Sequence, residues 1–149
     1  MTPYVAVVGP GRASEEQARL AEDVGRRLGE AGAVVVCGGL GGVMEASCRG
    51  VKEGGGTTLG LLPGSDRAQA NAHVDIAVAT GLGEARNALV VRAADVLIAV
   101  AGEYGTLSEI ALALKTGTPV VGLGTWDIDG IVPASSPAEA VDLALERAK

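Results

Sequence analysis

Residues 96–109 read VLIAVAGEYGTLSE and combine the most apolar run of the chain with a glycine-bearing turn. Val96–Val100 is apolar at every position, which is typical of a central parallel strand covered by helices on both faces. The following residues predict a turn and then a helix, with Thr106 as its N-cap and Glu109 completing a capping box. Because a helix N-terminus at the carboxyl end of a strand attracts anions, the segment also predicts a ligand site.

The same order of apolar strand, turn and amphipathic helix extends through the chain. Strands are predicted at residues 4–8, 33–37, 57–62, 74–80, 96–100, 120–123 and briefly near 130–132, and helices at about 14–31, 43–53, 84–94, 106–116 and from 136 onwards. Strands that alternate with helices form right-handed βαβ units. We therefore expect one domain over residues 1–149, with an α/β fold: a doubly wound Rossmann-like sheet of six or seven mostly parallel strands with helices on both faces. The strand that contains Asp75 should lie near an edge.

The composition argues against several classes of protein. The chain has 149 residues, 48% of them hydrophobic, and a formal net charge of −6, so it offers no basic surface to a nucleic-acid backbone. No apolar run approaches the roughly 20 residues of a membrane span, and we expect a cytoplasmic protein that binds neither nucleic acid nor membrane. Cys37 and Cys48 lack metal-ligand spacing and the only histidine is His73, so no metal site built from protein ligands is expected.

Three glycine turns each follow a predicted strand and precede a predicted helix. Since the carboxyl ends of parallel strands meet at one edge of the sheet, these turns should converge on the crevice where such folds bind ligands. Glycine lets a backbone approach a ligand closely, so the turns predict a phosphorylated small molecule as the ligand. The residues assigned to this site are Gly9, Gly11, Gly38, Gly39, Gly41, Gly42, Gly102, Tyr104, Gly105 and Thr106.

Two better known phosphate motifs match these turns poorly. A dinucleotide-binding fold needs a third glycine after the first strand, but the residues that follow Gly11 are Arg12, Ala13 and Ser14. It also needs an acidic residue at the end of the second strand, where Cys37 stands. A P-loop needs Gly-Lys followed by Ser or Thr, which follows none of the three turns.

Arg86 and Glu109 are the candidate catalytic residues. Arg86 falls in the first turn of a predicted helix, where a cation opposes the helix dipole, so an anion in the crevice would explain its position. The alternative is a solvated surface arginine. Glu109 has the spacing of the capping boxes at residues 14–17 and 136–139, which require no chemistry, so a purely structural role is its alternative.

Residues 102–109, GEYGTLSE, resemble the glycine-rich signature of the Lonely Guy superfamily, long described as lysine decarboxylase-like. Gly38–Glu45 resembles a second glycine-rich segment of that superfamily, and the similarity covers roughly residues 4–123. Two positions depart from the signature, since Ala101 replaces a proline and Glu103 replaces a glycine. The short chain and the form of the turn resemble the branch that includes molybdenum cofactor carrier proteins.

The resemblance implies two different functions. As a carrier-like protein, the chain would bind a nucleotide or a molybdopterin-type cofactor as cargo. As an enzyme, it would be a phosphoribohydrolase that cleaves the N-glycosidic bond of cytokinin or other nucleoside 5′-monophosphates, with Arg86 and Glu109 as catalytic residues. The resembled families are oligomeric, which implies a homodimer or homotetramer. The aliphatic helix residues expected at its interface are Leu89, Val90, Ile110 and Leu114.

Overall fold

The computed structural model describes residues 1–148 and contains one seven-stranded sheet. The strands are β1 (Tyr4–Val8), β2 (Val34–Cys37), β3 (Thr57–Leu62), β4 (Ile76–Ala79), β5 (Val96–Val100), β6 (Val120–Leu123) and β7 (Ile131–Ala134). They lie in the order β4-β3-β2-β1-β5-β6-β7, and every neighbouring pair is parallel. The prediction of a doubly wound α/β sheet is confirmed, and the sheet is wholly rather than mostly parallel.

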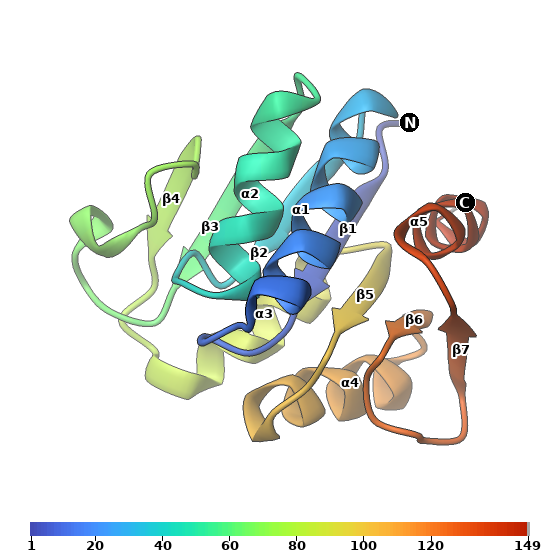
Figure 1. Cartoon of the computed structure of the whole chain (residues 1–149). Helices are drawn as coiled ribbons and strands as arrows, with labels where there is room; N and C mark the ends of the chain where they lie inside the picture. Colours follow the sequence, from blue (N-terminus) through green and yellow to red (C-terminus); the bar gives the residue numbers. More distant parts are fainter. Residues whose placement is uncertain (149) are drawn as a thin grey trace.

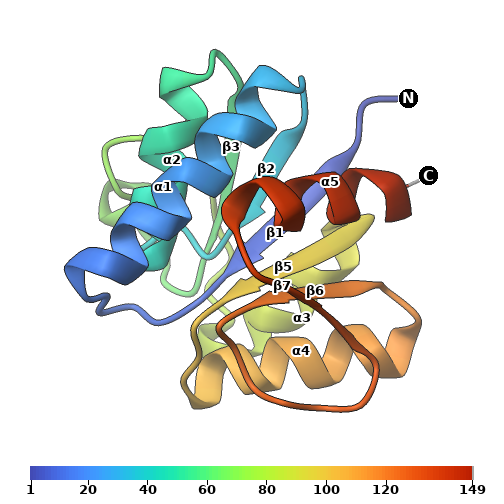
Figure 2. The same cartoon turned by 45° about the vertical axis from the view of Figure 1, so that its right-hand side comes forward.

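Five α-helices cover the two faces of this sheet (Figure 1). They are α1 (Glu15–Glu30), α2 (Val43–Glu53), α3 (Arg86–Ala93), α4 (Tyr104–Thr116) and α5 (Pro137–Arg147), with short 3-10 turns η1 (Arg67–Gln69) and η2 (Gly83–Ala85). Figure 2 shows α1, α2 and α5 on one side of the sheet and α3 and α4 on the other. One prediction differs from the structure: the helix predicted over residues 84–94 is the 3-10 turn η2 followed by the shorter α-helix α3.

The core consists of two aliphatic layers because alternate residues of a strand point to opposite faces. In β1, Val5 and Val7 pack in the layer beneath α1, α2 and α5, whereas Ala6 and Val8 pack in the layer beneath α3 and α4. All five residues of β5 are buried, as the apolar run predicts. The strand β4 lies at one edge of the sheet, which confirms the position predicted from the polar Asp75 in this segment.

The helices α1 and α2 contact each other through their backbones. A β-carbon on Gly25 would lie 2.0 Å from the carbonyl oxygen of Ser47, and one on Gly50 would lie 2.0 Å from that of Glu22. Because any side chain at these two positions would collide with the opposite backbone, the glycines set the close approach of the two helices.

The surface expected at a subunit interface needs correction. Val90 and Ile110 are fully buried in the layer beneath α3 and α4, so they stabilise the chain itself and cannot contact another copy. Helical periodicity assigned these residues to one face but could not tell a core-facing stripe from an exposed one. Of the four residues, Leu89 is the most exposed, at 39%. None of the helices described within residues 1–148 has the length and apolar character needed to cross a membrane.

Candidate functional site

A cavity of about 370 Å³ lies where β1 separates the two halves of the sheet. The strand β2 lies on one side of β1 and β5 on the other, so the chain reverses its direction of winding here, which is where open parallel sheets bind ligands. Gly9 follows β1, Gly38 follows β2 and Thr106 follows β5, and all three line the cavity. Three segments distant in the sequence therefore meet at one place, as the glycine turns predicted.

The structure divides the glycines assigned to this site into two groups. Gly9, Gly11, Gly38 and Gly105 line the cavity. Gly39, Gly41, Gly42 and Gly102 lie outside its lining, and Tyr104 lies in a neighbouring hollow. Gly39 and Gly42 have φ angles of +79° and +64°, and a β-carbon on them would collide with the Leu62 side chain and the Pro10 carbonyl oxygen, respectively. Backbone conformation and close packing therefore account for glycine at these two positions without any contact to a ligand.

Arg86 is the first residue of α3, and its guanidinium group reaches across to the turn after β2. A β-carbon on Gly38 would lie 2.6 Å from Arg86 Nη2, so glycine is what allows the arginine into this position. Arg86 Nη1 donates to the side-chain oxygen of Asn87, and Asn87 Nδ2 donates to Ser108 Oγ on α4, at 3.4 Å. Arg86 Nε is buried and has no hydrogen-bond partner among residues 1–148. One donor of the guanidinium group is therefore left without a partner beside the cavity.

The start of α4 differs from the prediction. The N-cap is Glu103, whose side chain makes no capping hydrogen bond, and the helix begins at Tyr104. The amide of Leu107 donates to the Glu103 carbonyl at 2.9 Å, so helical bonding begins before Thr106. Thr106 and Glu109 consequently form no capping box. The Thr106 side chain is 2% exposed, and its hydroxyl has no hydrogen-bond partner within the described chain.

Glu109 is a buried carboxyl group in the cavity wall. It is 7% exposed, and it lines the cavity together with Arg86. Burial raises the pKa of the Glu109 carboxyl to about 7, although the positive charge of Arg86 opposes this change. The structural role proposed for Glu109 as a helix cap is therefore wrong, because the residue lies in the second turn of α4 and makes no capping bond. A carboxyl group with this pKa can exchange a proton near neutral pH.

The loop between β3 and β4 is tied to the glycine turn beside the cavity. Two hydrogen bonds from Asn71 hold the loop against this turn. The backbone amide of Asn71 donates to the Gly39 carbonyl at 2.9 Å, and its side-chain amide donates to the Leu40 carbonyl at 2.9 Å. Leu40 lines the cavity. No sequence pattern identifies Asn71, since a loop asparagine carries no signal of such a distant contact.

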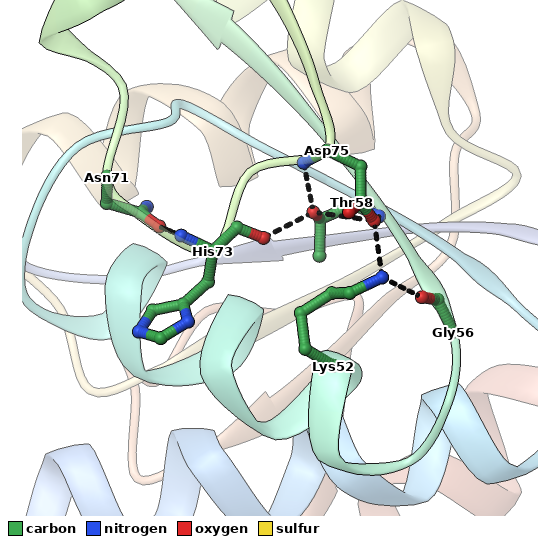
Figure 3. A network of polar contacts seen from close by, with 6 residues as sticks. All are labelled: Lys52, Gly56, Thr58, Asn71, His73 and Asp75. Atoms are coloured by element: carbon green, nitrogen blue, oxygen red, sulfur yellow. Dashed lines mark hydrogen bonds and ion pairs between the residues drawn. The ribbon is translucent and has the colours of Figure 1, made fainter.

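A second network fixes the far end of this loop (Figure 3). Lys52 Nζ lies 2.8 Å from Asp75 Oδ2, which also accepts from the Thr58 amide at 2.9 Å. Thr58 Oγ1 donates to the His73 carbonyl at 2.6 Å. The contact thus uses the backbone of His73, while its imidazole ring is absent from the cavity lining.

A neighbouring hollow of about 440 Å³ is lined by Gly102, Glu103, Tyr104, Gly105 and Trp126. Glu103 and Gly105 also line the main cavity, so the two spaces adjoin. Trp126 was missed from the sequence because it lies in the irregular segment after β6, with no motif around it. Its presence here follows only from the pairing of β5 with β6.

The residues that could bind a metal are dispersed. Within residues 1–148, no three His, Cys, Asp or Glu side chains gather closely enough to hold a metal ion. Cys37 and Cys48 are both buried, with their sulfur atoms 3.4 Å apart. Both lie near the turn after β2, where Cys37 Sγ also accepts from the Gly39 amide at 3.3 Å.

Three known proteins resemble this chain over almost its full length. An uncharacterized protein of Archaeoglobus fulgidus is 44% identical over 142 residues, which cover 95% of this chain and 93% of that protein. The molybdenum cofactor binding protein from Rippkaea orientalis is similar in structure with a TM-score of 0.92 and 36% identity, over 98% of this chain and 97% of that one. The Moco carrier protein from Chlamydomonas reinhardtii has a TM-score of 0.89 and 37% identity, over 98% and 97% of the two chains.

The family is given by a match along the sequence. The model of the SLOG cluster4 family matches residues 2–146. Because this match includes every strand, every helix except the last residue of α5, and all residues that line the cavity, it applies to the fold and the candidate site together. The chain belongs to the SLOG cluster4 family.

Proposed function

We propose that this chain is a carrier-like protein that binds a phosphorylated small molecule, of the molybdopterin type or a nucleotide, in the cavity between β1, β2 and β5. The observation that carries this proposal concerns Arg86 Nε and Thr106 Oγ1, the two of the three unpartnered buried side-chain polar atoms among residues 1–148 that belong to residues of the cavity wall. Buried donors are almost always satisfied in folded proteins, so an acceptor supplied by a ligand would complete them. The first amide groups of α4 lie beside Thr106 and add donors of their own.

The charge of the cavity wall favours a ligand with a single phosphate group. Arg86 is the only lysine or arginine among the residues that line the cavity, whereas Glu84, Glu103 and Glu109 contribute three carboxyl groups. Each further phosphate would add negative charge near these carboxyl groups without a further cation to balance it. A phosphate monoester therefore suits the site better than a di- or triphosphate.

The similar structures support molybdopterin as a candidate ligand. Two of them are described as binding or carrying the molybdenum cofactor, and they align over nearly the whole of this chain. Molybdopterin consists of a fused pterin ring system with one phosphate monoester, which matches the charge argument. No protein metal ligand is required, since the metal would arrive as part of the cargo.

Paired compounds test the proposal through the melting temperature of the protein. A ligand that binds only the native state raises this temperature by mass action. We expect 6-hydroxymethylpterin monophosphate and GMP to raise it, and 6-hydroxymethylpterin, guanosine and ATP to raise it much less at the same concentration. Equal increases for the phosphorylated and unphosphorylated partners would remove the phosphate site from the proposal.

A second candidate function rests on Glu109. A buried carboxyl with a pKa of about 7 beside Arg86 is suited to phosphoribohydrolysis of nucleoside 5′-monophosphates. In that reaction a water oxygen forms a bond to C1′ of the ribose, the C1′–N bond breaks, and the proton released by the water passes by way of the carboxylate to the leaving base. Arg86 would hold the 5′-phosphate.

Product analysis separates this enzyme from a carrier. Incubation with AMP, GMP or a cytokinin nucleotide should release the free base and ribose 5-phosphate if the chain is a hydrolase, and Glu109→Gln should abolish that release. Binding of the nucleotide without either product would leave the carrier function and reject the hydrolase.

A further inference from the structure

Two aromatic side chains form a wall beside the main cavity. Tyr104 is the first residue of α4, and Trp126 lies after β6. Their ring centroids are 6.3 Å apart with an angle of 28° between the planes, so the rings are stacked. Tyr104 is nevertheless 83% exposed, in a chain whose aromatic residues amount to 2%. An exposed aromatic face beside a ligand cavity is a surface on which a planar ring can stack.

The backbone of Gly102 and Glu103 holds the Trp126 side chain of this wall in place. Trp126 Nε1 donates to the Glu103 carbonyl at 3.3 Å. A β-carbon on Gly102 would lie 2.7 Å from the same nitrogen, so the indole packs directly on the glycine backbone. The tryptophan is therefore positioned by the residues that lead into α4, and Tyr104 stacks on a fixed partner.

Gly105 separates the two spaces and has no evident role in the fold. A β-carbon there would meet no atom within 4 Å, and its φ is not among the positive values. Glycine weakens a helix relative to alanine, and nothing around Gly105 offsets this loss. Gly105 lines both the main cavity and the aromatic hollow. Its missing side chain leaves an opening between them.

We propose that the hollow of Tyr104 and Trp126 binds the planar ring of a ligand whose phosphate lies beside Arg86, and that the ligand crosses Gly105 between the two. The ligand class is a fused heterocycle, a pterin or purine, that carries one phosphate monoester. This subsite rests on the proposed function, because the phosphate position defines which ring is within reach. It adds a contact that recognises the ring, whereas the main cavity recognises the phosphate.

Substitution of the tyrosine tests the ring contact. Calorimetric titration with 6-hydroxymethylpterin monophosphate should show at least a tenfold loss of affinity in Tyr104→Ala and wild-type affinity in Tyr104→Phe, since stacking needs the ring and not the hydroxyl. The melting-temperature increase caused by millimolar inorganic phosphate should be the same in all of these proteins. Tyr4→Ala is a matched control, because Tyr4 begins β1 at the opposite end of the sheet.

Two further measurements complete the test. Trp126 is the only tryptophan, so its fluorescence should change on addition of 6-hydroxymethylpterin monophosphate and remain constant with inorganic phosphate. Gly105→Ala should raise the melting temperature of the free protein and yet weaken binding of the pterin phosphate.

The outcomes distinguish this subsite from the function on which it rests. Wild-type affinity for the pterin phosphate in both Tyr104→Ala and Gly105→Ala would overturn the subsite and leave the phosphate cavity in place. If the wild-type protein binds neither 6-hydroxymethylpterin monophosphate nor GMP, the proposed function and the subsite are overturned together.

Discussion

Ala101 is the only non-glycine residue with a positive φ, 54°, among residues 1–148. It directly follows β5, and its amide donates to the Leu123 carbonyl at 3.0 Å, so the neighbouring strand holds it in this conformation. A left-handed conformation costs a residue with a β-carbon about 1–2 kcal/mol. The proline of the resembled signature is locked near a φ of about −65° and could not adopt this angle. Strain is thus located at the turn that leads into the candidate site.

Ala101→Gly should increase the free energy of unfolding by up to about 1 kcal/mol, because relief of the strained conformation exceeds the greater flexibility of glycine in the unfolded chain. Urea denaturation measures this difference. Ala99→Gly is the control within β5, where the alanine is fully buried in extended backbone and its loss should destabilise the protein. A loss of stability in Ala101→Gly equal to that of the control would show that the turn is unstrained.

Glu109 should make stability depend on pH between about 4.5 and 7. Below pH 4.5 the Glu109 carboxyl is protonated in both the folded and the unfolded chain. As the pH rises, the unfolded chain loses this proton first, because the pKa of Glu109 in the folded chain is raised to about 7. The folded state then binds more protons, so the free energy of unfolding falls as pH rises through this window and is constant above it. At about 1.4 kcal/mol per pH unit, the total loss is on the order of 3 kcal/mol.

Glu109→Gln removes the ionisable group and keeps its shape. The variant should match the wild type near pH 4.5 and exceed its free energy of unfolding at pH 8, as measured by denaturation at both values. The same stability difference between the two proteins at both pH values would contradict the raised pKa.

At the residue scale the sequence predicted part of the site. Arg86 and Glu109 line the same cavity as Gly9 and Gly38, although they come from different elements. Their proximity could be predicted because the carboxyl ends of parallel strands lie at the same edge of a sheet, whatever the order of the strands. Trp126 reaches the site through the pairing of β6 with β5, a contact distant in sequence, and no local pattern marks it.

The element scale shows where local patterns are sufficient and where they fail. The bounds predicted for β1, β3, β5, β6 and α2 agree with the structure, because apolar runs and glycine stops mark these elements. The N-cap of α4 was predicted three residues too late, at Thr106 instead of Glu103. The chain turns at Ala101 and Gly102, and this strained turn allows helical bonding to begin at once. Thr106 has the residue type of an N-cap, but tertiary structure overrides that preference.

Glycines within helices should divide by what surrounds them. Gly50→Ala should destabilise the protein by about 1–3 kcal/mol, because the new methyl group would press against the Glu22 carbonyl and force α1 and α2 apart. Thermal or urea denaturation measures the effect. Gly105→Ala, with open space at the same atom, is the matched control and should be stabilising. Similar effects of both substitutions would show that the two helices tolerate separation.

At the scale of the whole molecule, the order of strands places the site. The alternation of strands and helices predicted a parallel sheet, but it could not give the order β4-β3-β2-β1-β5-β6-β7, since each strand's neighbours depend on contacts distant in sequence. That order puts β1 between β2 and β5 and brings their turns together. The cavity is a consequence of topology, and its specificity is a consequence of the few polar side chains that the turns contribute.

The chain should form a homodimer or homotetramer in solution. Several aliphatic side chains remain exposed after folding, among them Ile76 and Val78 on the edge strand β4, Leu82 before α3 and Leu89 on α3. Burial of such residues against a second copy would remove apolar surface from water. Sedimentation velocity at micromolar concentration should give a mass above that of one chain, and a single monomeric species would contradict this expectation.

The most direct test of the account is the affinity of one ring compound with and without its phosphate. Calorimetric titration of the wild-type protein with 6-hydroxymethylpterin monophosphate should show one binding site per chain and an affinity at least tenfold higher than for 6-hydroxymethylpterin. Arg86→Ala should lose that preference, since it removes the only cation of the cavity wall. Equal affinities of the wild-type protein for the two compounds would contradict the account.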